Sequence, residues 1–232
     1  MGFFYGIDIT YIIFVMPALL VAMWAQFNVN STFNKYKKIG NSRGYTAFDV
    51  ARRILDMNGL YNVKIERVAG HLSDHFDPRS NVVRLSDSTY QSNSVAAIGV
   101  AAHEVGHAVQ HATSYAPIKV RNAIVPVVQI SSYAAFPLAL LGIVFANRFM
   151  INAGILLFIT VVLFQIITLP VEFNASRRAI KTLDKNYILE GAELTGAKKV
   201  LTAAALTYVA SAAVAIGNLL RLLVLAGGRS RD

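Results

Sequence analysis

The chain has 232 residues, of which 55% are hydrophobic, and a mean hydropathy of +0.47, which favours a membrane protein. It contains no cysteine, which excludes disulfides and thiolate metal ligands, so any metal must be held by histidines and carboxylates. The net charge of +9 comes from basic residues in the loops between apolar runs, a pattern typical of membrane topology, and we expect no nucleic-acid partner.

Four apolar stretches are each long enough to cross a bilayer. The first begins at Phe3, and we interpret it as an anchor because no Lys or Arg precedes it and no clear cleavage site follows. The predicted organisation is a transmembrane helix over 1–27, a cytoplasmic region over 28–122, a transmembrane hairpin over 123–171, a cytoplasmic segment over 172–199, and a fourth transmembrane helix with a C-terminal tail over 200–232.

The first polar region carries signals for a helix and two strands. Thr46–Asp49 has the pattern of a capping box, and Asn58-Gly59 is a stop signal for the helix that follows it. Val63–Val68 and Asn81–Leu85 are predicted strands, separated by a turn-rich loop over His71–Ser80. We expect a small sheet with an exposed edge that can pair with an extended peptide, and we expect the second strand to hold the substrate.

A helix predicted over Val95–His111 contains the sequence HEVGH. Its two histidines, His103 and His107, are four residues apart and therefore lie on one helix face, where both imidazoles can reach one ion. Glu104 lies close enough to contact a water molecule on that ion, which is the metalloprotease arrangement with a glutamate as general base. Gly106 costs the helix about 1 kcal/mol relative to Ala, but it would let another backbone or a substrate approach closely.

A catalytic zinc usually has a third protein ligand. His111 is an unsuitable candidate, because it lies about 12 Å from His103 along the helix axis. His71 and His75 in the loop could ligate a metal, orient a substrate or simply be solvated. Glu172 follows the third apolar run and lies on the same predicted side as the zinc helix, but it could equally be an interfacial charge, and spacing alone does not decide between these roles.

The distribution of basic residues predicts the orientation in the membrane. The sections 28–121 and 172–199 hold 12 and 6 of the 22 Lys and Arg residues. By the positive-inside rule both sections face the cytoplasm and both termini lie outside, in the plasma or inner membrane.

Three sequence stretches together resemble the YugP-like family of bacterial membrane zinc peptidases: DHFDPRSNVVRLS at 74–86, VAAHEVGHAVQHA at 100–112 and LPVEFNASRRA at 169–179. With the four spans, this resemblance covers nearly the whole chain. The chain is more distantly similar to the HtpX-like and CAAX-prenyl-protease-like gluzincins, whose third ligand is a glutamate on a later helix. The resemblance implies one zinc ion held by His103, His107 and Glu172, with Glu104 as the base.

Two positions depart from these patterns. Asn174 stands where the YugP-like pattern usually has Asp, and it could take part as a neutral hydrogen-bonding group. Ser176 stands where the distant gluzincins have an Asp that orients a ligand histidine. Arg177 and Arg178 could bind the peptide or stabilise the oxyanion, or they could be ordinary positive-inside charges.

The sequence therefore predicts a mainly α, multi-pass membrane protein with about four transmembrane helices and a gluzincin-like core that includes a small β-sheet. The predicted activity is that of a zinc metalloendopeptidase at the cytoplasmic face, with Glu104 taking a proton from zinc-activated water. One alternative is a site-2-type intramembrane protease. Another is a scaffold or chaperone whose structural zinc is closed by a fourth ligand such as His71 or His75. The expected partners are the lipid bilayer and a protein substrate, while oligomerisation and accessory proteins stay open.

Overall fold

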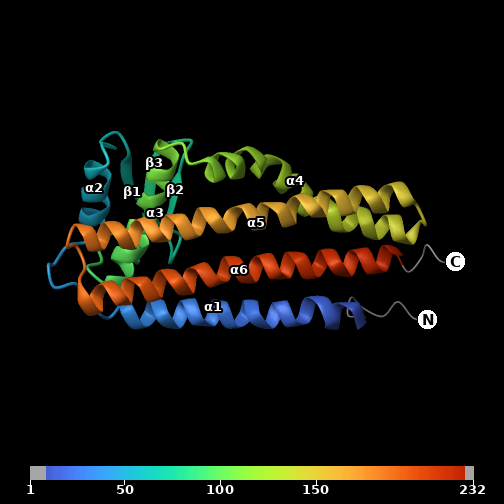
Figure 1. The fold of residues 1–232 in the computed structure, drawn as a ribbon, viewed down its shortest axis with the longest axis horizontal. Coiled ribbons are helices and arrows are strands. Elements are labelled where there is room, and N and C mark those ends of the chain that lie inside the picture. Colours follow the sequence, from blue (N-terminus) through green and yellow to red (C-terminus); the bar gives the residue numbers. More distant parts are fainter. Residues whose placement is uncertain (1–8, 228–232) are drawn as a thin grey trace. The chain divides into compact units, whose positions relative to one another are not determined.

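A computed structural model describes residues 9–227 and is mainly helical (Figure 1). The predicted start of the first span at Phe3 and the predicted C-terminal tail lie outside the described residues. In chain order the elements are the π-helix η1 (Tyr11–Val15), α1 (Met16–Tyr36), α2 (Ala47–Met57), β1 (Lys64–Val68), β2 (His75–Asp77), β3 (Val82–Ser86), α3 (Val95–Ala112), α4 (Ala116–Val144), α5 (Arg148–Lys185) and α6 (Gly191–Gly227).

Four helices are long and apolar enough to cross a membrane: Tyr11–Tyr36, Ala116–Val144, Arg148–Lys185 and Gly191–Gly227. Each overlaps one of the four predicted apolar runs, and all four continue into the polar sections. The residues from 172 to 199 are thus mostly helical, forming the end of α5, a short turn and the start of α6. The helix α5 continues because an apolar stripe with a spacing of four residues stays buried along it, at Val171, Ala175, Ala179 and Leu183.

The described residues form two compact units. One contains the residues up to Gln26, Val120–Leu169 and the residues from Thr207 onward, and the other contains Phe27–Lys119 and Pro170–Leu206. The second unit carries the sheet, α2, α3 and the polar ends of α1, α5 and α6. All candidate site residues named above belong to this second unit.

The sheet has three strands in the order β1-β3-β2, with β1 parallel and β2 antiparallel to β3. The strand β2 lies inside the segment His71–Ser80, so the prediction of a loop without a strand was wrong there. It has only three residues and is held by antiparallel pairing with β3, in which Phe76 lies opposite Val83. Since β3 is paired on both sides, our expectation that this strand holds the substrate was also wrong, and β2 is the edge strand beside α3.

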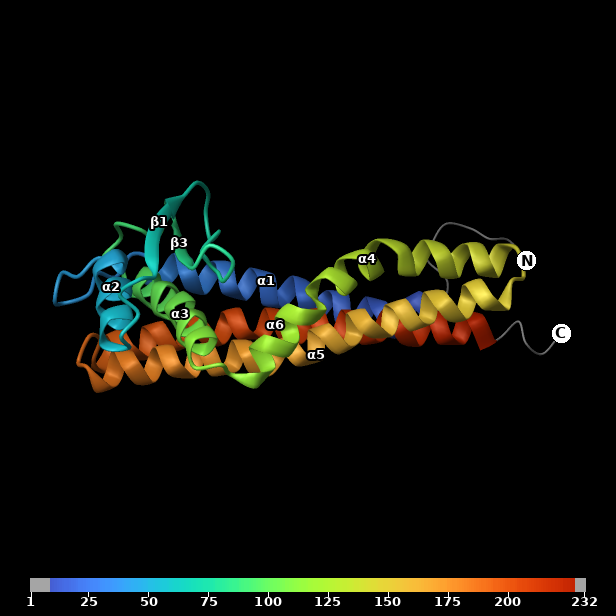
Figure 2. The same cartoon turned by 90° about the horizontal axis from the view of Figure 1, so that it is seen from above.

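The helices α2 and α3 pack against one another next to the sheet (Figure 2). The predicted capping box begins α2: the Thr46 hydroxyl accepts a hydrogen bond from the Asp49 amide, and the Asp49 carboxylate accepts one from the Thr46 amide. The helix α3 begins at the N-cap Ser94, and its small residues allow it to be buried on nearly every side. This burial gives the HEVGH segment a rigid support.

Candidate metal centre

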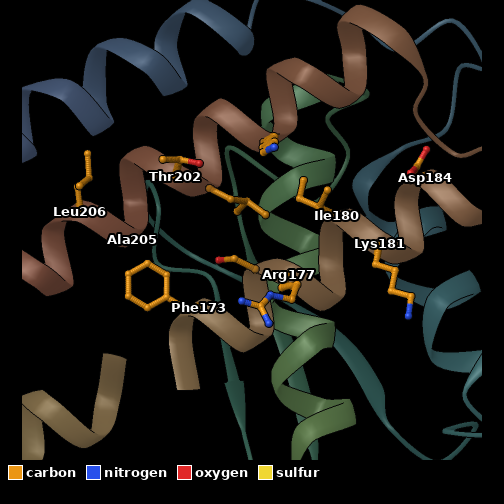
Figure 3. A pocket seen from close by; sticks show the side chains of 11 residues that line it. Phe173, Arg177, Ile180, Lys181, Asp184, Thr202, Ala205 and Leu206 are labelled. Atoms are coloured by element: carbon orange, nitrogen blue, oxygen red, sulfur yellow. The ribbon is translucent and has the colours of Figure 1, made fainter. Parts of the chain in front are cut away.

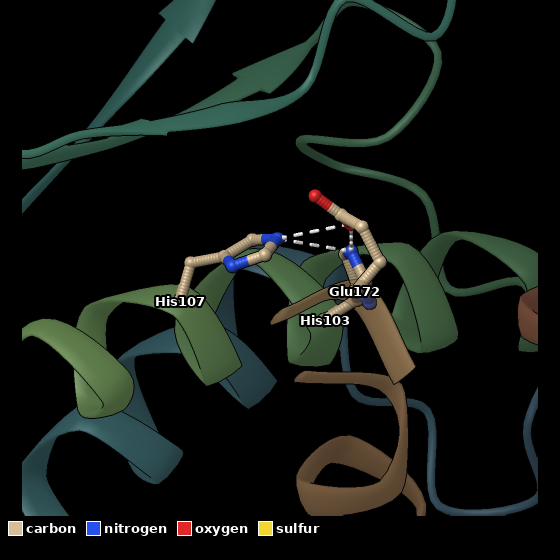
Figure 4. A group of neighbouring side chains, drawn as sticks. All are labelled: His103, His107 and Glu172. Atoms are coloured by element: carbon tan, nitrogen blue, oxygen red, sulfur yellow. Dashed lines mark hydrogen bonds and ion pairs between the residues drawn. The ribbon is translucent and has the colours of Figure 1, made fainter. Parts of the chain in front are cut away.

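Three side chains converge in the second unit: His103 and His107 from α3, and Glu172 from α5 (Figure 4). The His103 Nε2 atom lies 3.1 Å from His107 Nε2 and 3.2 Å from Glu172 Oε2, and the His107 Nε2 atom lies 3.4 Å from the same oxygen. A tetrahedral zinc site with bonds of about 2.0–2.1 Å places its ligand atoms about 3.3–3.4 Å apart. The three donors therefore have the chemistry and the spacing of one face of a zinc tetrahedron.

Gly106 is the residue that lets α5 come close enough to α3 to place Glu172 there. A Cβ atom built on Gly106 would lie 2.9 Å from the carbonyl oxygen of Ala175. Real Cβ atoms in proteins essentially never come this close to another heavy atom. Ala175 is on α5, one turn beyond Glu172. The prediction that a small residue here admits another backbone is confirmed.

The outer nitrogen of each histidine has its own hydrogen-bond partner. The His103 Nδ1 atom lies 3.1 Å from Ser176 Oγ, and the His107 Nδ1 atom lies 3.0 Å from Gln110 Oε1. Both rings are thereby held with Nε2 toward Glu172. Ser176 thus contacts a candidate ligand, although it supplies a hydroxyl and not the carboxylate expected from the gluzincin resemblance.

Gln110 is a site residue that sequence reasoning missed. Its side chain is fully buried, and its Nε2 atom donates to the Val171 carbonyl oxygen at 2.8 Å and to Asn174 Oδ1 at 3.0 Å. Asn174 Oδ1 also accepts a hydrogen bond of 2.7 Å from Arg178 Nε. A polar residue on the histidine face of α3, three positions after His107, was the available sequence signal.

The cluster is strongly shielded from solvent, with exposed fractions of 9% for His103, 8% for His107 and 2% for Glu172. Burial disfavours the imidazolium form of His107, but the hydrogen bond to Glu172 and the charges of Glu104 and Glu172 outweigh it. The pKa of His107 is therefore raised above its ordinary value.

Glu104 is half-buried and reaches the edge strand β2. Its Oε2 atom accepts a hydrogen bond of 3.1 Å from the Phe76 amide. Since the Phe76 amide points away from β3 and toward α3, the carboxylate is anchored at the edge of the sheet that faces α3. Its negative charge also contributes to the raised pKa of His107, which places it near the cluster.

The other three histidines lie outside the cluster. The rings of His71 and His111 contact Phe33 and Phe76, with centroid distances of 5.5 and 5.8 Å. The His75 Nδ1 atom lies 2.8 Å from the Ser73 carbonyl oxygen. Within residues 9–227, only His103, His107 and Glu172 form a group of this kind, so no fourth protein donor closes it.

A cavity of about 500 Å³ lies between α5 and α6 beside the cluster (Figure 3). Ser176, whose hydroxyl contacts His103, is one of the residues that line it. Arg177 faces the same cavity, whereas Arg178 is hydrogen-bonded to Asn174. The remaining wall is mostly apolar with three further charged side chains: Phe173, Ile180, Lys181, Asp184, Lys198, Leu201, Thr202, Ala205 and Leu206.

Comparisons with known proteins agree with this geometry. Residues 11–227 match the family model described as "Putative neutral zinc metallopeptidase". The chain is 48% identical over 223 residues to the protein named "Putative membrane protease YugP" from Bacillus subtilis (strain 168), covering 96% of this chain and 99% of that protein. No solved structure matches the chain. The length of both matches, together with four apolar helices and a buried His-His-Glu group, shows that this membrane protein belongs to the neutral zinc metallopeptidase family.

Proposed function

We propose that the protein is a zinc metalloendopeptidase that cleaves membrane or membrane-proximal proteins at the cytoplasmic face, with one zinc ion held by His103, His107 and Glu172. The observation that carries this proposal is the spacing of the three donor atoms, 3.1–3.4 Å, in a buried site. Three protein donors are typical of catalytic zinc, whereas structural zinc has four. The donor set thus favours a peptidase over a scaffold with a structural metal.

The position of the histidines favours cleavage outside the hydrocarbon layer. They lie on α3, which is not among the four candidate spans of the described chain. A site-2-type protease would instead carry its histidine pair inside a span. The cytoplasmic orientation itself rests on the concentration of Lys and Arg in the two polar sections that supply the donors.

Zinc bound at this site would polarise a scissile carbonyl and make a water molecule acidic enough to react near neutral pH. Glu104 is the proposed general base. The Phe76 amide holds Glu104 Oε2, and we assign the proton transfer to Oε1. Glu104 accepts the proton of the attacking water and then delivers it to the leaving amine.

The strand β2 is the proposed substrate platform. In an extended strand the amide and carbonyl of one residue point to the same side, so the Phe76 carbonyl shares the edge that faces α3. An extended peptide that donates a backbone hydrogen bond to this carbonyl would lie directly beside Glu104.

Two variants test the assignments in purified protein reconstituted in lipid. Glu104→Gln should retain zinc but abolish peptide cleavage, because the amide cannot act as a base. Glu172→Ala should lose zinc and activity together. Glu190→Gln is the matched control, since Glu190 is an exposed carboxylate paired with Arg43 at the surface. Undiminished cleavage by Glu104→Gln would refute the base assignment, and full zinc content in Glu172→Ala would move the third ligand elsewhere.

A further inference from the structure

We propose that Gln110, Asn174 and Arg178 form a hydrogen-bond relay that fixes the ring proton of His107 on Nδ1 and so keeps its Nε2 lone pair directed at the metal. This inference rests on the proposed zinc site and assigns the three side chains a positioning role. The relay connects α3 to α5 through contacts of 2.7–3.0 Å.

The direction of each hydrogen bond follows from two groups whose roles are unambiguous. The Arg178 guanidinium can only donate, so the Asn174 atom that faces it must be the carbonyl oxygen. The Val171 backbone carbonyl can only accept, so the Gln110 atom that faces it must be the amide nitrogen. The same Gln110 nitrogen then donates to Asn174 Oδ1, which closes a consistent chain.

These assignments leave Gln110 with Oε1 toward His107. An amide oxygen accepts only, so the His107 Nδ1 atom must carry a hydrogen and donate it. A neutral imidazole has a single ring proton, and Nε2 is therefore the unprotonated nitrogen with its lone pair toward His103 and Glu172. This is the tautomer that a metal ligand requires.

The relay distinguishes the two histidines. The partner of His103 is a serine hydroxyl, which can donate or accept and therefore does not select a tautomer. Gln110 is also fully buried, so water does not replace its hydrogen bonds when one partner is removed. The fold therefore selects the tautomer of the neutral His107 ring before metal binds.

The test compares zinc affinities, measured by competition with a chromophoric chelator, for four variants. Gln110→Met removes the oxygen that accepts from His107 Nδ1, and Asn174→Leu removes one of the two acceptors of the Gln110 amide. Gln110→Met should weaken zinc binding by about 10- to 100-fold, as expected for a lost partner of a ligand histidine. Asn174→Leu should weaken it by less, because the Val171 carbonyl still accepts from the Gln110 amide. Asn174→Asp should bind nearly as tightly as wild type, because a carboxylate oxygen also accepts from Gln110 and Arg178. His111→Gln, an exposed change on the same helix, is the control.

The double variant Gln110→Met/Asn174→Leu separates a relay from two independent effects. In a relay the double variant binds zinc no more weakly than Gln110→Met alone. Asn174 acts only by holding the Gln110 amide, and this amide is already absent from Gln110→Met. Additive losses, or wild-type affinity in Gln110→Met, would overturn the proposal. If Gln110→Met does not fold, as judged by thermal unfolding without metal, equal affinities of Asn174→Leu and Asn174→Asp would overturn it.

A second readout does not depend on zinc or on peptidase activity. In metal-free protein with ¹⁵N-labelled histidine at alkaline pH, NMR should find the His107 proton on Nδ1 in wild type and in Asn174→Asp. Gln110→Met should show mixed tautomers. A wild-type protein that binds no zinc would contradict the proposed function, whereas a His107 proton on Nε2 would contradict the relay.

Discussion

Gly106→Ala tests whether the close approach of α5 to α3 creates the site. The new methyl group would lie 2.9 Å from the carbonyl oxygen and 3.3 Å from the Cα atom of Ala175, and both are backbone atoms that cannot rotate away. Removing a helical glycine should stabilise α3 by about 1 kcal/mol. Overpacking of this kind costs about 1–3 kcal/mol. We therefore expect a net loss of stability of up to about 2 kcal/mol.

We expect Gly106→Ala to impair zinc binding and peptide cleavage more than its loss of folding stability alone would explain. Glu172 and Ser176 flank Ala175 on α5, so a displacement of this backbone moves a donor away from the histidines and a hydroxyl away from His103. We expect Gly106→Ala to bind zinc more weakly and to cleave peptide slowly even at temperatures where it is folded.

Gly99→Ala provides a matched control within the same helix. Its methyl group would meet Ala197 Cβ at 3.4 Å, an ordinary contact, so the gain in helix propensity should stabilise the protein by up to about 1 kcal/mol. Thermal unfolding of metal-free protein and a zinc titration measure both effects. If Gly106→Ala were as stable as Gly99→Ala and bound zinc like wild type, the proposed role of the close approach would be refuted.

Three further predictions concern the groups around the donors. Because the pKa of His107 is raised, protons compete with zinc over a wider pH range than for an ordinary histidine, so zinc affinity should fall as pH is lowered through that pKa; a titration at several pH values checks this, and a flat profile would contradict it. Phe76→Pro removes the amide that holds Glu104 and should slow cleavage by about 10- to 100-fold while zinc content is retained; an unchanged rate would exclude this anchor. Ser176→Ala should weaken zinc binding by about tenfold, since His103 loses its Nδ1 partner, and wild-type affinity would show that this contact is dispensable.

The sequence predicted the parts of the fold that have local signals. The four apolar runs, the capping box at Thr46 and the helix that carries HEVGH each depend on residues a few positions apart, and the structure contains all of them. The strand β2 escaped prediction because its three residues are held by β3 and by the contact between Phe76 and Glu104, neither of which is local. Because β2 was not predicted, the sequence also did not predict that β3 is paired on both sides.

In the candidate site, too, residues with local sequence signals could be predicted and residues that depend on long-range contacts could not. Helical spacing placed His103 and His107 together, whereas Glu172 came from the family resemblance because no local rule connects it to α3. Gln110 could not be assigned from sequence, since its partners Val171 and Asn174 lie 61 and 64 positions away. A buried amide acquires its role only when a second helix supplies its acceptors.

The most direct test of the account is a structure of the zinc-loaded protein with anomalous scattering recorded at the zinc edge. We expect one zinc peak per chain, about 2.0–2.2 Å from His103 Nε2, His107 Nε2 and a carboxylate oxygen of Glu172. A peak coordinated by other residues, or a Glu172 carboxylate well beyond bonding distance from the metal, would contradict it.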